Sequence, residues 1–409
     1  MKVHRVNLQN ARGLGLIELM VALAISALLL LGLVQLFSGT RVAYQTTEGL
    51  ARVQENGRFA MDFLQRDIRM AGHMGCVADA AHYLETDAAL RLGQPAVPPD
   101  VHSHFITLAN RNAGNTTAAP YAARMDMAIQ GYEAVNTGPT NVLTLLANPV
   151  ASSNVNAWDP PLPADLANRV VEGSDVVVVR FMSTDSAPVT NVSNFAVPPT
   201  ITVPIAYRDY VDTTTGSGLF GLTDCLKTSV FQNSTAADAF GVFQVQTVAP
   251  NVSGFTGDEG YVANSATLHR AEIYAYYVGI GAGGIPALFR LRYNRGLAPL
   301  GEELVEGVEN MQLLYGHDTQ TAPLPDGAVD AYGTAAAIFA LPRPEQVDWH
   351  RVGIVRVGLL MRSTEAAGIG AQPAAGYPLL GLVITPPNDA RLRSTYVNSV
   401  ALRNRLFGN

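Results

Sequence analysis

Glu18 is the side chain whose type and position most invite a chemical role. It is the one ionisable residue in an apolar run of 24 residues from Leu14 to Phe37. A carboxylate in a membrane span costs a few kcal/mol at the bilayer centre and less near the interface, so its presence invites a functional explanation. The physics alone leaves open a simpler interpretation, in which a charge four residues into the run lies at headgroup level.

Cys76 and Cys225 are the only two cysteines of the chain. In a domain outside the cytoplasmic membrane, an even pair suggests a disulfide. The bridge would close a loop of about 150 residues, which the chain-entropy model values at roughly 4–5 kcal/mol. Two unrelated buried thiols are the alternative interpretation.

Two groups of residues have metal-binding types without a complete metal-binding pattern. His102 and His104 would place two imidazoles on one face of a strand, but no third zinc ligand is identifiable. Asp318, Asp326 and Asp330 do not have the EF-hand spacing, so a solvated loop is the default and a Ca²⁺ site the alternative.

Residues 279–284, GIGAGG, have the spacing of a dinucleotide fingerprint. That motif needs a helix after the glycines, whereas here Ile285-Pro286 leads into another strand, so we expect a glycine-rich hairpin. The sequence contains no G-x-S-x-G, H-E-x-x-H or Walker A motif. We therefore expect neither an enzyme nor a cofactor.

The last part of the chain holds the one basic concentration, Arg391, Arg393, Arg403 and Arg405. It could contact DNA, but ion pairing within this acidic protein or with a partner subunit is the favoured interpretation. The net charge is −7, and loss of the first thirteen residues would leave 24 basic against 34 acidic residues, or −10. A chain of this charge is a poor candidate for nucleic-acid binding.

The element that must position Glu18 is a long helix. The run 14–37 would be about 36 Å long, enough to cross a hydrocarbon core of about 30 Å. The preceding residues carry Lys2, Arg5 and Arg12 and no acidic residue. This charge bias predicts a cytoplasmic N-terminus, with everything after Phe37 on the other side of the membrane.

The helical pattern continues beyond the apolar run to Ala71. No proline interrupts residues 40–71, and apolar residues recur there at spacings of three, four and seven. Gly72 is a suitable stop. The result would be a single helix over 14–71, apolar all round in its first half and amphipathic in its second.

The remainder divides by composition. Residues 73–260 are rich in small and polar residues, with strand-like runs at 141–146, 175–182 and 240–248. Residues 261–409 are more regular, and we expect strands at 271–278, 287–293, 311–315 and 350–361, with a helical turn at 302–308.

The start of the chain resembles a type IV prepilin (class III) signal. Such signals have a short basic leader ending in Gly, then a hydrophobic residue, then Glu as the fifth mature residue; here these are Gly13, Leu14 and Glu18. The resemblance implies cleavage between Gly13 and Leu14 by a prepilin peptidase and N-methylation of Leu14. Many members have Phe and Thr where this chain has Leu14 and Gly15, which makes methylation less secure than cleavage.

Cleavage would give Glu18 a partner. The new amino group of Leu14 lies four residues away on the same helical face. In this family the glutamate is thought to pair with the terminal amine of a neighbouring subunit. Two charges that are unfavourable singly in lipid become tolerable as a pair, so we expect Glu18 to direct assembly.

The chain also resembles the PilW-like minor pilins, in residues 69–76, 303–310, 355–360 and 400–405. The resemblance implies an α+β, pilin-like fold in which a long helix, half transmembrane and half amphipathic, packs on an antiparallel β-sheet domain. The expected organisation is a leader (1–13), the helix (14–72, spanning the membrane over 14–37), a variable region (73–260) and a C-terminal pilin region (261–409).

The implied function is that of a minor pilin, which helps to initiate or cap a type IV pilus. Its expected partners are other minor pilins, the major pilin, the prepilin peptidase and the inner-membrane assembly platform. It would be embedded in the inner membrane with a periplasmic domain before entering the fibre. A type II secretion pseudopilin, or a pilus-tip adhesin or DNA-binding subunit, are the alternatives.

Overall fold

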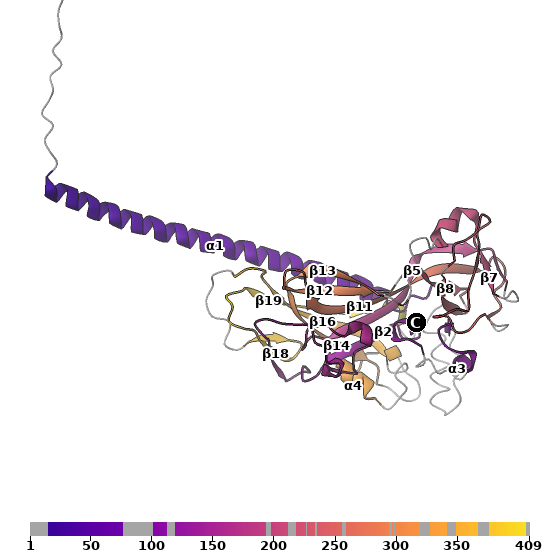
Figure 1. The fold of residues 1–409 in the computed structure, drawn as a ribbon. Coiled ribbons are helices and arrows are strands. Elements are labelled where there is room, and N and C mark those ends of the chain that lie inside the picture. The colour runs from indigo at the N-terminus through magenta and orange to yellow at the C-terminus, as the bar shows by residue number, and fades with distance from the viewer. Residues whose placement is uncertain are drawn as a thin grey trace, which may run out of the picture.

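The computed structural model describes residues 15–76, 101–112, 119–193, 198–211, 218–225, 227–233, 235–255, 259–293, 297, 299–319, 328–341, 349–366 and 376–405. Figure 1 shows a long helix that projects from a β-rich body, with a smaller lobe at the end of the body far from the helix N-terminus. The described chain therefore has three parts: helix, body and lobe.

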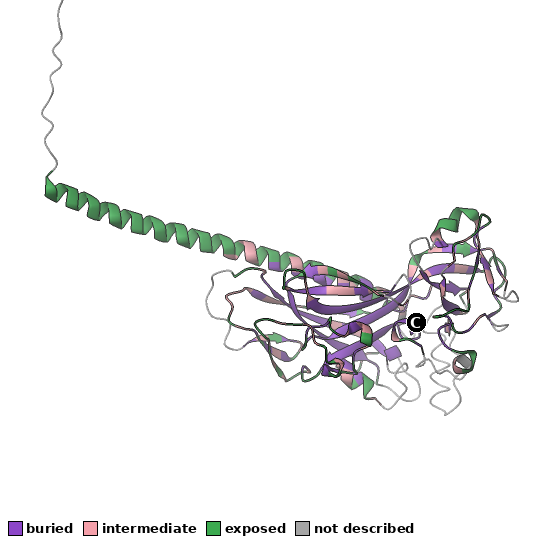
Figure 2. Cartoon of the chain, in the orientation of Figure 1, coloured by how far each residue is buried: buried purple, intermediate pink, exposed green. Residues whose placement is uncertain are grey.

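The helix is α1 (Leu16–Met70), 55 residues long. Its first half is exposed and its second half buries one face, as the change from green to purple shows in Figure 2. The buried positions recur every three or four residues: Val53, Gly57, Ala60, Met61, Leu64, Asp67 and Ile68. The predicted helix is present and ends one residue before its expected end, while Leu14 lies outside the described residues.

The largest sheet has nine strands in the described part of the chain. They are β1 (Val101–Ser103), β2 (Ile129–Ala134), β4 (Trp158–Asp159), β5 (Val176–Val189), β8 (Gly218–Thr223), β9 (Thr228–Asn233), β11 (Ala266–Ile280), β12 (Pro286–Arg292) and β13 (Leu300–Glu306). The long antiparallel strands β5 and β11 form its centre. The first part of β11 also pairs with β8 and its last part with β12, so the same strands build body and lobe.

A second, antiparallel sheet completes the body. Its order is β15 (Ala331–Gly333), β14 (Val308–His317), β16 (Val352–Arg362), β19 (Arg393–Ala401). The second half of α1 contacts β16 and β19 of this sheet and β5 and β13 of the larger one. One hydrophobic core joins α1 to both sheets. The predicted α+β, pilin-like fold is confirmed.

The lobe comprises the described residues of 183–268. It contains the three-stranded sheet β10 (Val242–Gln244), β7 (Thr200–Thr202), β6 (Asn191–Ser193), the 3₁₀ helix η5 (Ile205–Val211), β8, β9 and the ends of β5 and β11. A separate hydrophobic core fills it. The lobe is thus a folded unit built on two strands that leave the body.

The remaining elements are short. They are the strands β3 (Val142–Thr144), β17 (Tyr377–Leu379) and β18 (Leu382–Thr385), the α-helices α3 (Leu108–Asn112) and α4 (Ala335–Phe339), and the 3₁₀ helices η2 (Tyr121–Ala123), η3 (Val155–Ala157), η4 (Ala164–Leu166) and η7 (Arg403–Arg405).

The predicted strands are present, with β3 and β10 shorter than expected. The helical turn predicted at 302–308 is wrong, because Leu300–Glu306 is strand β13. Glu and Leu favour a helix there, but Val305 is buried and Glu302 pairs across the sheet with Arg290, so tertiary contacts override local propensity. Gly307, with φ of 83°, then turns the chain into β14.

Two carboxyl groups meet in the interior where β2 and β5 face β14. Asp175 accepts hydrogen bonds from the backbone N–H groups of Ala134 (2.9 Å) and Leu313 (2.8 Å), so it links the two sheets. Burial, together with the nearby Asp175 charge, raises the pKa of Glu133 to about 10. Burial raises the pKa of Asp175 to about 7, although its amide donors and Glu133 oppose that rise. Glu133 is therefore protonated at neutral pH and shares its proton with Asp175.

This proton predicts a pH dependence of stability. The folded chain keeps a proton on Glu133 that the unfolded chain releases above its ordinary pKa of 4.5, so the free energy of unfolding falls as pH rises from there towards 10. Glu133→Gln imitates the protonated acid, so its free energy of unfolding should fall less steeply with pH than that of the native chain. The difference between the two slopes should be up to about 1.4 kcal/mol per pH unit. Urea unfolding at pH 6, 7.5 and 9 measures it. Glu303→Gln, on an exposed residue of β13, is the control, and equal slopes for Glu133→Gln and the native chain would contradict the assignment.

Candidate assembly site on the N-terminal helix

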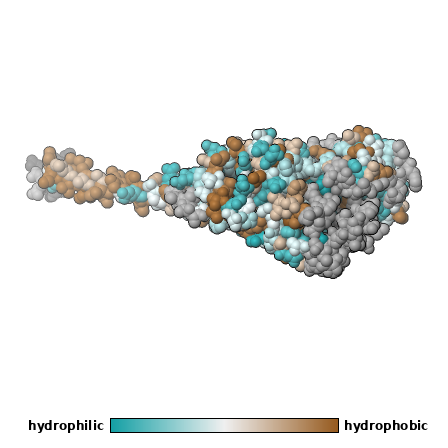
Figure 3. All heavy atoms as spheres, turned by 90° about the horizontal axis from the view of Figure 1, so that it is seen from below, coloured by the Kyte–Doolittle hydropathy of each residue, from teal (hydrophilic) through white to brown (hydrophobic). Residues whose placement is uncertain are grey.

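The first half of α1 presents a continuous apolar surface to its surroundings. Side chains from Leu16 to Phe37 are exposed, with Leu28 at 72% and Phe37 at 69%. Figure 3 shows this surface as a brown rod that projects from a body of mixed polarity. By length and composition α1 can cross a membrane. Such a surface needs lipid or other helices around it, because exposed apolar area of this extent is unfavourable in water.

Glu18 lies in the first turn of α1. Its Oε2 accepts a hydrogen bond from the backbone N–H of Gly15 at 3.1 Å. A carboxylate in this position satisfies a donor that the helix leaves free and favours the positive end of the helix dipole. Gly13 and Leu14 lie outside the described residues, so cleavage, methylation and the pairing of Glu18 with the Leu14 amine stay predictions.

The second half of α1 approaches the body most closely at Gly57. A Cβ on Gly57 would lie 2.6 Å from the ring of Tyr396 on β19, so only glycine leaves room for that ring. Tyr396 is partly buried against the main core. This close contact fixes the position of the helix along β19.

A buried polar link joins α1 to the large sheet. Asp67, 3% exposed, accepts hydrogen bonds from the Tyr276 hydroxyl and, at 3.2 Å, from Arg290. Arg290 also pairs with Glu302 at 2.8 Å, and its guanidinium lies over the ring of Tyr274. Burial and the Asp67 charge raise the pKa of Tyr276, so its hydroxyl stays a donor. The link selects one register between helix and sheet, because a shift would leave these charges unpaired in the core.

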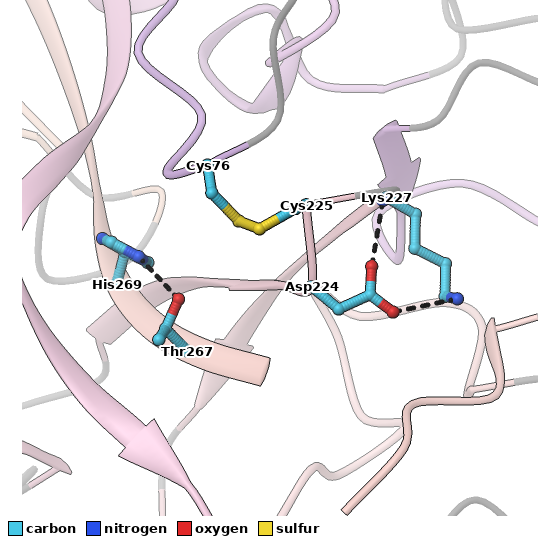
Figure 4. The surroundings of a disulfide bond; sticks show 6 residues. All are labelled: Cys76, Asp224, Cys225, Lys227, Thr267 and His269. Carbon is cyan, nitrogen blue, oxygen red and sulfur yellow. Dashed lines mark hydrogen bonds and ion pairs between the residues drawn. A yellow bond between two sulfur atoms is a disulfide. The ribbon is translucent and has the colours of Figure 1, made fainter. Parts of the chain in front are cut away.

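The chain after α1 is tied covalently to the lobe. Gly72, with φ of 79°, ends the helix as predicted and donates its N–H to the Arg180 carbonyl at 3.0 Å. Cys76 then forms a disulfide with Cys225, 149 residues away in the turn between β8 and β9 (Figure 4). The predicted disulfide is confirmed.

Two of the four arginines in the basic concentration near the C-terminus, Arg391 and Arg393, form ion pairs within the body. Arg393 has a fully buried side chain that binds Glu309 at 2.6 Å and Asp389 at 2.7 Å. Arg391 pairs with Asp389 at 3.5 Å and donates to the carbonyl groups of residues 363 and 364. The side chain of Arg405 lies outside the described residues. Internal pairing, the favoured interpretation, therefore holds for Arg391 and Arg393.

The predicted histidine pair acquires a carboxylate neighbour that the sequence did not indicate. Glu259 lies 3.7 Å from His102 Nδ1 and 3.3 Å from His104 Nε2, and His104 Nδ1 bonds the Ser253 carbonyl. The described part of the chain nevertheless contains no group of three or more His, Cys, Asp or Glu side chains that could hold a metal ion.

The structure also describes part of the aspartate group and all of the glycine-rich segment 279–284. Asp330 accepts hydrogen bonds from Thr319, while Asp326 lies outside the described residues. Residues 279–284 form the expected hairpin between β11 and β12, closed by the hydrogen bond from the Gly281 N–H to the Ile285 carbonyl at 2.9 Å.

Two family models match the chain. The prokaryotic N-terminal methylation motif covers residues 8–34, and the type IV pilus-assembly protein W, PilW, covers residues 275–404. Over these segments the chain is similar to the PilW-like type IV pilins. No curated protein and no solved structure matches it.

The matched segments coincide with the parts described above. The methylation motif includes Gly13, Leu14 and Glu18, and fits a membrane-anchored pilin. The PilW match includes the whole second sheet, on which α1 packs, whereas the lobe lies outside it. Both families consist of pilus proteins, not of enzymes. The two matches therefore cover the first part of α1 and the sheet on which the second part of α1 packs.

Sequence reasoning missed the polar residues that hold the helix. Asp67 lies between Leu64 and Ile68, at a position that the helical spacing assigns to the buried face. A charge at a buried helical position is a signal that could have been found. Tyr276 and Arg290 carry no such signal, since any strand of alternating pattern could have supplied the partners.

Removal of the Asp67 carboxylate should weaken the joint between helix and body. Asp67→Ala leaves the Tyr276 hydroxyl and Arg290 buried with a partner lost, which we expect to lower the free energy of unfolding by about 3–5 kcal/mol. Asp67→Asn keeps an acceptor and should cost less. Urea unfolding of the full chain in detergent micelles measures both, and a change below about 1 kcal/mol for Asp67→Ala would contradict the assigned role.

Loss of the disulfide should destabilise the chain through the unfolded state. The double substitution Cys76→Ser, Cys225→Ser frees a loop closed over 149 residues, and we expect it to lower the free energy of unfolding by about 2–5 kcal/mol. Denaturant unfolding under non-reducing conditions measures the difference. The reduced native chain is the control, and it should match the double variant.

Proposed function

We propose that the chain is a minor pilin of a type IV pilus, a membrane-anchored subunit that helps to initiate or cap the fibre. One observation carries the proposal: a methylation-motif helix exposes its whole apolar half and docks only its second half on a PilW-like body. Such a helix can lie in the bilayer first and among other helices later without any change in the body.

Glu18 would act at the transfer from membrane to fibre. After cleavage between Gly13 and Leu14, the new amine of Leu14, which we expect to be N-methylated, is a cation at the helix terminus. Glu18 of one subunit would pair with this amine on its neighbour, so that neither charge stays alone among apolar helices. In the chain with its leader, the carboxylate is held by the Gly15 N–H.

The position of the lobe supports placement at the tip. The lobe lies at the end of the body opposite the N-terminus of α1 (Figure 1), so with the helix in the fibre core it would extend away from the membrane. Extra bulk at that end is easier to accommodate at the tip than between subunits of the shaft.

The partners and location follow from this role. The helix would lie in the inner membrane, with the N-terminus in the cytoplasm and body and lobe in the periplasm, until the fibre carries it to the cell surface. At the inner membrane, the prepilin peptidase and the assembly platform would act on the chain. Other minor pilins and the major pilin would pack against its helix. The PilW match favours a pilus over a type II secretion pseudopilin.

Glu18→Ala should separate membrane insertion from assembly. We expect unchanged membrane retention but about a tenfold lower amount in sheared pili, equivalent to about 1.4 kcal/mol of lost interaction. Quantitative immunoblots of membrane and pilus fractions measure both, and mass spectrometry checks that each protein begins at Leu14.

Glu48→Ala is the matched control, because Glu48 is a partly exposed glutamate of the same helix whose i,i+4 pair with Arg52 contributes little. Normal incorporation of Glu18→Ala would refute the role of the carboxylate. A native chain that begins at Met1 would refute the pilin function itself.

A further inference from the structure

The lobe joins the body through an irregular segment of the central strand pair. Ala271 pairs with Met182 and His269 with Ser186, so the β5–β11 ladder shifts between these positions and residues 183–185 bulge out. Side chains hold this bulge: the Tyr210 hydroxyl donates to the Asp185 carbonyl at 2.7 Å, and the Arg270 N–H donates to Ser183 Oγ at 3.1 Å. We call residues 182–186 and 269–271 the junction.

Two histidines from different elements bind the junction. His73, just after α1, holds Met182 twice: its carbonyl accepts from the Met182 N–H at 2.6 Å, and its Nδ1 bonds the Met182 carbonyl at 2.8 Å. His269 on β11 bonds the Ser183 carbonyl through Nδ1, also at 2.8 Å. Consecutive carbonyl groups of β5 are thus held by two imidazoles, each of which must donate from Nδ1.

The His269 ring is enclosed. It is 6% exposed, its Nε2 bonds the Thr267 hydroxyl at 3.0 Å, and a Cβ on Gly75 would lie 3.1 Å from that nitrogen. Figure 4 shows Thr267 and His269 beside the Cys76–Cys225 disulfide. The centroid of the His73 ring lies 6.4 Å from that of His269. A proton on His269 would therefore place a cation in an enclosed space beside the His73 ring.

The other charged groups of the packed elements are stacked on rings, ion-paired or exposed to solvent. On β11, Arg270 lies over the rings of Tyr210 and Phe220. In the turn after β8, Asp224 pairs with Lys227 at 3.1 Å. On β5, the Asp185 side chain is exposed, while its backbone carbonyl accepts the hydrogen bonds that hold the bulge.

We propose that the junction is an acid-sensitive hinge, in which protonation of His269 beside His73 loosens the attachment of the lobe while the disulfide keeps it tethered to the end of α1. A domain outside the cytoplasm experiences the pH of the surroundings. Acidification then changes the freedom of the lobe relative to the helix without unfolding the body.

The direction follows from proton linkage. Burial, together with the nearby His73, lowers the pKa of His269 below its ordinary value of 6.5, against the opposing effect of the Ser183 carbonyl. The closed junction therefore binds fewer protons than the open one below about pH 6.5. Its stability is fully present at neutral pH and is lost as pH falls below that value.

Hydrogen exchange of the full-length chain in detergent micelles tests the hinge at pH 7.5 and 5.0, after correction for intrinsic rates. We expect peptides that cover the junction to exchange several-fold faster at pH 5.0 than at pH 7.5, because the open junction binds the His269 proton more tightly than the closed one. Peptides from β14 and β16 should not change. Equal junction protection at both pH values would overturn the proposal.

The double substitution His73→Asn, His269→Asn keeps N–H donors for the two carbonyl groups but removes both imidazole rings. It should stay protected at pH 5.0, and an acid response equal to the native one would overturn the proposal. If the double variant exchanges fast at both pH values, His269→Asn alone decides: protection at pH 7.5 without an acid response supports the hinge, and an unchanged response refutes it. His317→Asn, a buried histidine on β14 in the body, is the matched control and should keep the native acid response.

Discussion

The exposed apolar half of α1 is the constraint on which the rest of the structure depends. Burial of one leucine or phenylalanine side chain contributes about 1.5–3 kcal/mol, so a surface of this size must be covered by lipid or by other helices. The body stays attached to this helix, whether lipid or other helices surround it, only if the other half of α1 is firmly bound to the body. Apolar packing across two sheets, the Gly57–Tyr396 contact and the buried Asp67 link provide that hold.

The two kinds of contact act differently. Apolar packing supplies most of the stability, because it scales with the area removed from water and tolerates small shifts. The Asp67 carboxylate supplies position, since only one register brings Tyr276 and Arg290 to it. Asp175 does the same between the two sheets through the N–H groups of Ala134 and Leu313. In both cases a buried charge is costly unless the geometry is met, so it excludes alternative arrangements.

Within the described residues, the lobe is connected to the body and to α1 by fewer elements than connect α1 to the body. It has its own core and lies outside the PilW match, yet it is built on the ends of β5 and β11 and is bound to the end of α1 by the disulfide. A force on the lobe therefore reaches the end of α1 through the disulfide as well as through the shared strands β5 and β11.

The sequence alone determined the features that depend on neighbours along the chain. Apolar content and spacing predicted α1 to within two residues of its described limits. Glycines predicted the end of α1 and the β11–β12 hairpin. The two cysteines predicted the disulfide. Only the tertiary structure decided that β13 is a strand, that Arg393 is buried, and that Asp67, Glu133 and His269 meet their partners. Those partners lie tens to hundreds of residues away, and local propensity carries no information about which distant groups the folding of the sheets brings together.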